Sequence, residues 1–154
     1  MNISERGIDF IKAQEKLRLT AEKNDAGIWT LGYGHAESVR EGDSVTPEQA
    51  EVLLVSDLNK CAELLRQKVE VPVTQDQFDA LCSILHSVGA GQQGVKAGLI
   101  ELKSGQPSTL LMFLNQGCYA AAEQFGSWIY AGNGVVKTLI TRREREKNLF
   151  LRHK

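Results

Sequence analysis

One helix start constrains the fold of this chain more than any other feature of its sequence. Thr46-Pro47-Glu48-Gln49 puts Thr at the N-cap, Pro at the first helical position and Gln three residues after the cap. This is a capping box with the Pro that first turns of helices favour. Apolar residues then recur at helical spacing and form one stripe, which is made of Leu54, Leu58, Cys61 and Leu65. The pattern predicts a long helix over 46–69 that ends before Pro72.

Further helices follow on the C-terminal side. A second capping box, Thr74-Gln75-Asp76-Gln77, opens a helix whose core face is Phe78, Leu81, Cys82 and Leu85. Five glycines within 89–105 indicate a loop or a loosely helical insertion, after which Ser108 or Thr109 caps a short helix through Leu114. Two more helices are predicted over 120–129 and 136–151, separated by the turn Gly132-Asn133-Gly134.

The N-terminal third has a different pattern. Ser4 opens a first helix, and the segment 20–35 then combines turn residues, a short β-prone run and further glycines. This arrangement predicts a small antiparallel hairpin. The expected fold is therefore α+β, with a small N-terminal β-hairpin lobe, a long connecting helix and a C-terminal helical lobe. Ligands commonly bind in a cleft between two such lobes.

Composition excludes several classes of function. The net charge of −1 gives no field that would attract the chain to polyanions, which argues against nucleic acid as a partner. No apolar run is long enough to cross a bilayer, and the first ten residues carry charges where a signal peptide would be apolar. The three cysteines, Cys61, Cys82 and Cys118, lack the spacing of a zinc site or a disulfide framework, so we expect reduced core residues.

Several segments together carry a resemblance to a known family. Glu15 with Leu17-Arg18-Leu19 comes first, and Gly27-Ile28-Trp29-Thr30-Leu31-Gly32-Tyr33-Gly34-His35 follows it. Later segments are Pro72-Val73-Thr74-Gln75-Asp76-Gln77-Phe78-Asp79-Ala80-Leu81, Pro107-Ser108-Thr109-Leu110-Leu111 and Thr141-Arg142-Arg143-Glu144-Arg145-Glu146. In this order they resemble the phage-type lysozymes, which are the endolysins of the T4 lysozyme family (glycoside hydrolase family 24). The resemblance covers nearly the whole chain.

The resemblance implies a fold and an activity. The fold would be one lysozyme-like domain over 1–154, with an N-terminal helix and β lobe over 1–45, a connecting helix over 46–69 and a helical lobe over 70–154. The activity would be hydrolysis of the β-1,4 bond between N-acetylmuramic acid and N-acetylglucosamine in peptidoglycan, with inversion, for lysis of a bacterial host. Neither a cofactor nor a metal is expected, and the protein is expected to act as a monomer.

The family's catalytic set is a Glu, an Asp after eight intervening residues and a Thr after five more. Glu15 matches the acid that protonates the leaving oxygen, and Thr30 matches the third position. The position of the Asp is occupied by Asn24. An amide orients water through hydrogen bonds but cannot accept its proton, so the general base is formally missing. Lys16 and Glu22 also depart from the family pattern, which has Gly and an aromatic residue there.

Three explanations of Asn24 remain open on the sequence alone. Asp25 takes the role of the carboxylate if the hairpin turn is shifted by one residue. Alternatively, Asn24 inactivates a site that is otherwise competent and leaves uncut substrate bound. In the third explanation a water held by Thr30 supports reduced turnover. The alternative function is accordingly an inactive lysozyme-fold protein that binds peptidoglycan.

Other residues that attract attention have ordinary structural interpretations. Trp29 is expected to pack in the core or between the lobes, and His35 to make a structural hydrogen bond. The run from Arg142 to Lys147 is expected to be a solvated helix face with charge pairs at i,i+3 and i,i+4. Because no apolar anchor precedes the first helix, the resemblance implies synthesis in the host cytoplasm and release to the cell wall through a holin, without stable membrane insertion.

Overall fold

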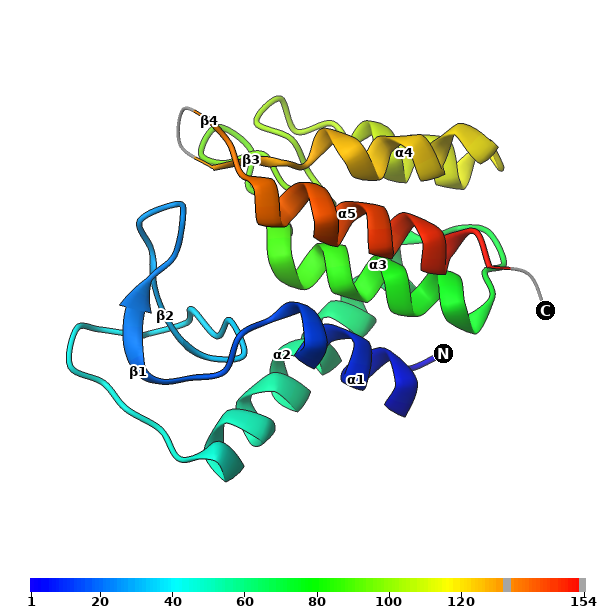
Figure 1. Ribbon diagram of the computed structural model, residues 1–154. Coiled ribbons are helices and arrows are strands. Elements are labelled where there is room, and N and C mark those ends of the chain that lie inside the picture. The colour runs from blue at the N-terminus through cyan, green and yellow to red at the C-terminus, as the bar shows by residue number, and fades with distance from the viewer. Residues whose placement is uncertain (132–133, 153–154) are drawn as a thin grey trace.

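The computed structural model of the protein describes residues 1–131 and 134–152 and has the predicted α+β architecture (Figure 1). In chain order the elements are α1 (Glu5–Gln14), β1 (Arg18–Lys23), β2 (Trp29–Gly32), α2 (Pro47–Lys68), α3 (Gln75–Val88), α4 (Thr109–Asn115), the 3-10 helix η1 (Tyr119–Ser127), β3 (Tyr130–Ala131), β4 (Gly134–Val135) and α5 (Lys137–Phe150). Within the described residues, no helix combines the length and the apolar character that crossing a membrane requires.

The predicted helix starts are confirmed. The Thr46 hydroxyl oxygen accepts a hydrogen bond from the backbone N–H of Gln49 at 3.1 Å, and Gln49 Oε1 accepts one from the Thr46 N–H at 2.9 Å. The same reciprocal pair joins Thr74 and Gln77 at the start of α3. Ser4 caps α1 by accepting from the Gly7 N–H. Local capping chemistry thus sets the first residue of each of these helices.

The helix α3 is the centre of the main hydrophobic core. It packs against α1, α2 and α5, and Figure 1 shows α5 running alongside it. Its side chains are buried on almost every face, so the helix has little contact with water. A second, smaller cluster joins α1 and α2 through Ile11, Leu54 and Leu58, with Tyr33 packed against it. This cluster attaches the N-terminal hairpin to the rest of the molecule.

The strands β1 and β2 form the antiparallel hairpin that the sequence predicts. Glu22 pairs with Thr30 and Lys23 with Trp29, and the register shifts between Arg18 and Glu22. The Lys23 ammonium lies 5.5 Å from the centre of the half-buried Trp29 ring, in cation–π contact. The hairpin extends away from the helices (Figure 1).

The structure differs from several expectations in the C-terminal part of the chain. The predicted helix over 120–129 is a 3-10 helix, and a second hairpin, β3–β4, follows it. Two residues of the predicted turn, Gly132 and Asn133, lie outside the described residues. Cys118 is exposed, whereas Cys82 is buried and Cys61 half-buried, so the predicted burial is wrong for Cys118. All three cysteines are free thiols.

Candidate active site

Glu15 lies at the C-terminal end of α1, where the helix gives way to extended backbone. Its N–H still donates to the Ile11 carbonyl at 2.9 Å, but its own φ and ψ are −95° and 127°. This change of direction turns the side chain out of the helix. The Glu15 side chain is 20% exposed, so the carboxylate is largely shielded but still reachable from solvent.

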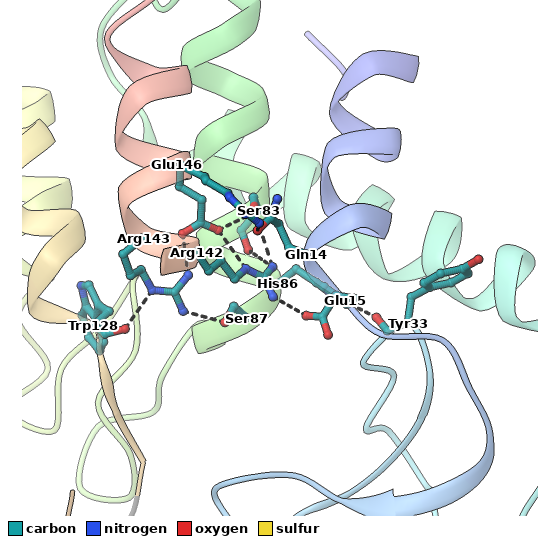
Figure 2. A network of polar contacts seen from close by, with 11 residues as sticks. Gln14, Glu15, Tyr33, Ser83, His86, Ser87, Trp128, Arg142, Arg143 and Glu146 are labelled. Carbon is teal, nitrogen blue, oxygen red and sulfur yellow. Dashed lines mark hydrogen bonds and ion pairs between the residues drawn. The ribbon is translucent and has the colours of Figure 1, made fainter. Parts of the chain in front are cut away.

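The charge partner of Glu15 comes from the far end of the chain. Arg142 of α5 donates from Nη1 to Glu15 Oε1 at 2.5 Å (Figure 2). The Arg142 side chain is only 7% exposed, and its Nη2 donates to the Ser83 carbonyl of α3 at 3.0 Å. The ion pair therefore joins α1 to α5 across α3, and one Glu15 oxygen has a fixed donor.

A glycine gives the Glu15 carboxylate its space. Gly34 follows β2 with φ of +81°, and a Cβ atom built there would lie 2.9 Å from Glu15 Oε2. A side chain at this position would push the carboxylate away, and the positive φ also favours glycine. The close approach explains in physical terms why glycine suits position 34.

Two histidines anchor the turn that contains Gly34. His35 Nδ1 lies 2.8 Å from Asp57 Oδ2 on α2, and His86 Nε2 on α3 lies 2.8 Å from the Tyr33 carbonyl oxygen. His35 also pairs with Leu31 through two backbone hydrogen bonds. The structural contact predicted for His35 is confirmed, and the turn is held to both helices beside Glu15.

Thr30 and Asn24 lie on the hairpin. Thr30 is buried, and its hydroxyl donates to the Glu22 carbonyl at 3.3 Å, which leaves the oxygen lone pairs free of that bond. Asn24 closes the turn: its N–H donates to the Ile28 carbonyl, and its side-chain oxygen accepts from the N–H groups of Ala26 and Ile28 at 2.9 and 3.0 Å. A carboxylate could accept the same two bonds, so the turn does not depend on the amide.

Asp25 is the first residue of the loop beyond this closing pair and is exposed. Gly27, with φ of +79°, completes the loop. The observed register therefore pairs Asn24 with Ile28 and leaves Asp25 one position further out.

The expectation that the charged run of α5 lies on a solvated face is wrong for three of its residues. Arg142, Arg143 and Glu146 are buried, and the Glu146 side chain has no exposed area. The predicted spacings do form pairs, because Glu146 accepts from Arg142 Nε at 3.2 Å and from Arg143 Nη1 at 2.5 Å. The three charges share a helical stripe with Leu139, Leu149 and Phe150, and this periodicity is the signal that could have placed them inside.

The buried arginines respond differently to their surroundings. Burial lowers the pKa of Arg142, but the carboxylates of Glu15 and Glu146 outweigh it, so the pKa lies above its ordinary value. For Arg143 burial prevails and lowers the pKa, with Glu146 opposing it and the Arg142 charge adding to it. For Arg142 the nearby carboxylates raise the pKa by more than burial lowers it, whereas for Arg143 burial has the larger effect.

Two pockets of the molecule lie away from Glu15. One of about 450 Å³ is open to solvent and is lined by the end of α2, the 90–107 segment and α4, and one of about 130 Å³ lies between α1, α3 and the end of α5. Neither is lined by Glu15. Among the described residues, no group of three His, Cys, Asp or Glu side chains is placed to hold a metal ion.

Comparisons with known proteins converge on one family. The family described as phage lysozyme matches residues 12–146. The endolysin of Acyrthosiphon pisum secondary endosymbiont phage 1 is 41% identical over 97% of this chain and 98% of its own length. The endolysin of Salmonella phage P22 is 38% identical over 98% and 99%. The solved muramidase domain of SpmX from Asticaccaulis excentricus superposes with a TM-score of 0.78 at 36% identity, covering 99% of both chains.

Proposed function

Because this chain belongs to the phage lysozyme family and is a muramidase-type endolysin acting on peptidoglycan, we propose that Glu15 is the general acid of glycan hydrolysis. The bond cleaved is the β-1,4 bond between N-acetylmuramic acid and N-acetylglucosamine. The observation that carries the proposal is the shielded Glu15 carboxylate, which has one oxygen bound by Arg142 and lies directly against Gly34, where a side chain would displace it.

The chemistry of Glu15 follows from this environment. In its protonated form the side chain donates a proton to the leaving glycosidic oxygen, and a carboxylate remains. The buried Arg142 guanidinium stabilises that carboxylate at the moment it forms, without the reorganisation that water would need. The attacking water releases a proton to the solvent as its bond to the sugar forms, and the solvent returns a proton to Glu15 after the product leaves.

The attacking water belongs on the hairpin side of the sugar. We propose that Thr30 and Asn24 orient this water, with Thr30 accepting a hydrogen bond from it and the Asn24 amide donating one. Since an amide takes no proton, turnover is reduced relative to a chain with Asp at position 24. The fixed turn around Asn24, with Asp25 beyond its closing pair, supports this assignment over a shifted turn.

Three variants test these roles by release of reducing ends from purified peptidoglycan. Glu15→Gln is expected to lower kcat by at least ~10²-fold, because the proton donor is lost. Asn24→Asp restores a base and raises kcat by ~10- to 100-fold. Asp25→Asn leaves kcat near that of the parent.

Two outcomes overturn the assignment. Loss of activity in Asp25→Asn would make Asp25 the catalytic carboxylate. A parent chain that binds peptidoglycan without cleaving it, and cleaves only after Asn24→Asp, would show that Asn24 disables the site.

The organisation and delivery of the enzyme are proposed on the same basis. One monomeric domain comprises the 1–45 lobe, the 46–69 helix and the 70–154 lobe, with the glycan bound between the lobes. Access to the wall depends on a holin, so expression of this chain alone leaves Escherichia coli intact, whereas co-expression with a holin lyses the culture. Lysis without the holin would contradict this route.

A further inference from the structure

The carboxylate of Glu146 is the centre of a buried polar network behind the candidate active site. It accepts hydrogen bonds from Arg142, Arg143 and the Ser83 hydroxyl, which belong to α5 and α3 (Figure 2). The Glu146 side chain has no exposed area, and Arg143 is 2% exposed. Full satisfaction of a buried carboxylate by three donors fixes its position.

This network determines where the Arg142 guanidinium points. Its Nε donates to Glu146 at 3.2 Å, its Nη2 to the Ser83 carbonyl at 3.0 Å, and its Nη1 to Glu15 at 2.5 Å. The guanidinium is planar, so two fixed edges define the direction of the third. Glu146 and Ser83 thereby aim Nη1 at Glu15, although neither is bonded to Glu15 itself.

The charges of the network also bear on the proton of Glu15. Two guanidiniums and the Glu146 carboxylate leave one positive charge that faces Glu15. Without Glu146 there would be two positive charges, and the ionised form of Glu15 would be favoured more strongly.

Other charged groups near Glu15 belong to separate contacts. Lys12 pairs with Glu51, His35 with Asp57, and Arg145 donates to Gln14 at 3.2 Å. On α3, His86 bonds the Tyr33 carbonyl. The arginines and Glu146 are therefore the charges that the network brings to bear on Glu15.

We propose that Glu146 and Ser83 are positioning residues for the hydrolysis: they hold Arg142 against Glu15, and the Glu146 carboxylate offsets one of the two guanidinium charges beside it. The inference rests on the proposed role of Glu15 as the acid. Neither residue touches the substrate in this scheme. Ser83 acts on the reaction through the position of Arg142, and Glu146 acts both through that position and through its charge.

The variant Glu146→Gln keeps the shape of the side chain and removes its charge. We expect kcat at neutral pH to fall by ~10-fold or more while KM stays within ~2-fold, since the acid is affected and sugar binding is not. The alkaline limb of the pH–kcat curve moves to lower pH by ~1 unit, because Glu15 gives up its proton more readily. Ser83→Ala keeps the charge of Glu146 and the backbone carbonyl that accepts from Arg142 but removes the hydroxyl that donates to Glu146, so we expect a smaller fall in kcat with KM unchanged.

A matched control lies one turn along α3. The Ser87 hydroxyl accepts from Arg143 Nη2 at 2.6 Å but makes no bond to Arg142. Ser87→Ala is expected to lower the melting temperature without moving kcat or the alkaline limb. A merely structural role of Glu146 would give the same pattern as this control.

The results separate the possible failures. A folded Glu146→Gln with the parental kcat and pH–kcat curve overturns the inference. If Glu146→Gln does not fold, Ser83→Ala decides, and an unchanged kcat in that variant overturns the inference as well. Retention of activity by Glu15→Gln would instead refute the proposed function, whatever Glu146→Gln shows.

Discussion

At the scale of single residues, Gly34, which has no side chain, matters as much for the geometry of the site as the charged residues do. Gly34 and Glu15 are neighbours because the turn after β2 passes over the end of α1. Any Cβ at position 34 would meet the carboxylate at a distance that real structures avoid, and the least costly response is movement of the flexible Glu15 side chain. The glycine therefore protects the geometry of the Glu15 carboxylate more than the stability of the fold.

Gly34→Ala tests this point. We expect a loss of ~10²-fold in kcat, because a small displacement of a catalytic group is enough to cause one. Stability should fall by roughly 1–2 kcal/mol from the strained φ. Gly42→Ala is the matched control, since Gly42 has φ of +90° and no atom within 4 Å of a Cβ built there. Equal activity of the two variants by the reducing-end assay would contradict the expectation.

The residues of the site differed in how far sequence could predict them. Glu15, Asn24 and Thr30 are close in sequence and fall on a motif, so they could be proposed before any fold was known. Arg142 could not, because its pairing with Glu15 joins residues at opposite ends of the chain and needs α3 between them. Charged side chains are also assigned to the surface by default, and only a folded core reveals those that are paired inside.

At the scale of elements, local hydrogen bonds at helix starts account for most of the agreement between sequence and structure. Ser4, Thr46, Thr74 and Ser108 each cap the helix predicted to follow them. The β3–β4 hairpin lacked such a signal, because each strand has only two residues and no alternation can be read from so few. The burial predicted for Cys118 was wrong because the average tendency of free cysteines to be buried does not determine the burial of one position.

Thr46→Ala removes one of the two hydrogen bonds of a capping box, the one that the Thr46 hydroxyl accepts. The N–H of Gln49 loses its acceptor, and we expect the free energy of unfolding to fall by about 1 kcal/mol. Thr46→Ser keeps the hydroxyl and should lose much less. Urea unfolding of the three proteins measures both differences, and an equal loss in the two variants would show that the hydroxyl is not what stabilises α2.

The thiol of Cys61 on α2 is expected to make the stability of the fold sensitive to alkaline pH. Burial raises its pKa from 9.0 to about 12, and the charge of Asp57 adds to this. The unfolded chain loses the thiol proton near pH 9 while the folded chain keeps it until about pH 12, so stability falls with rising pH across this window.

The contribution of this thiol can be isolated with Cys61→Ala. That variant should have a shallower fall in unfolding free energy above pH 9, by at most ~1.4 kcal/mol per pH unit. Parallel curves for the two proteins in urea unfolding at pH 8–11 would contradict the assignment. The burial of Cys82 also raises its pKa, so part of the slope remains in the variant.

At the scale of the whole molecule, the two hydrophobic clusters differ greatly in size. The main cluster surrounds α3, whereas the cluster that attaches the hairpin has three buried residues, Ile11, Leu54 and Leu58. Local opening costs least where few apolar contacts are broken. The β1–β2 hairpin is therefore expected to open more easily than the core around α3, and it carries the groups proposed to orient the attacking water.

Amide hydrogen exchange followed by mass spectrometry measures this difference. Peptides from 18–32 should exchange well before peptides from 75–88 under native conditions. A glycan oligomer that binds between the lobes should slow the hairpin peptides selectively. Equal protection of the two regions would show that the hairpin and α3 open as one unit.

The ion pair between Glu15 and Arg142 also sets an order of events in the cell. A ribosome makes α1 first and α5 last, so the half-made enzyme carries its acid without the arginine that holds it. If Glu15 acts as proposed, its fixed cationic partner is in place only after α5 has been translated and has docked. A nascent chain that still lacks α5 therefore has the carboxylate without that partner.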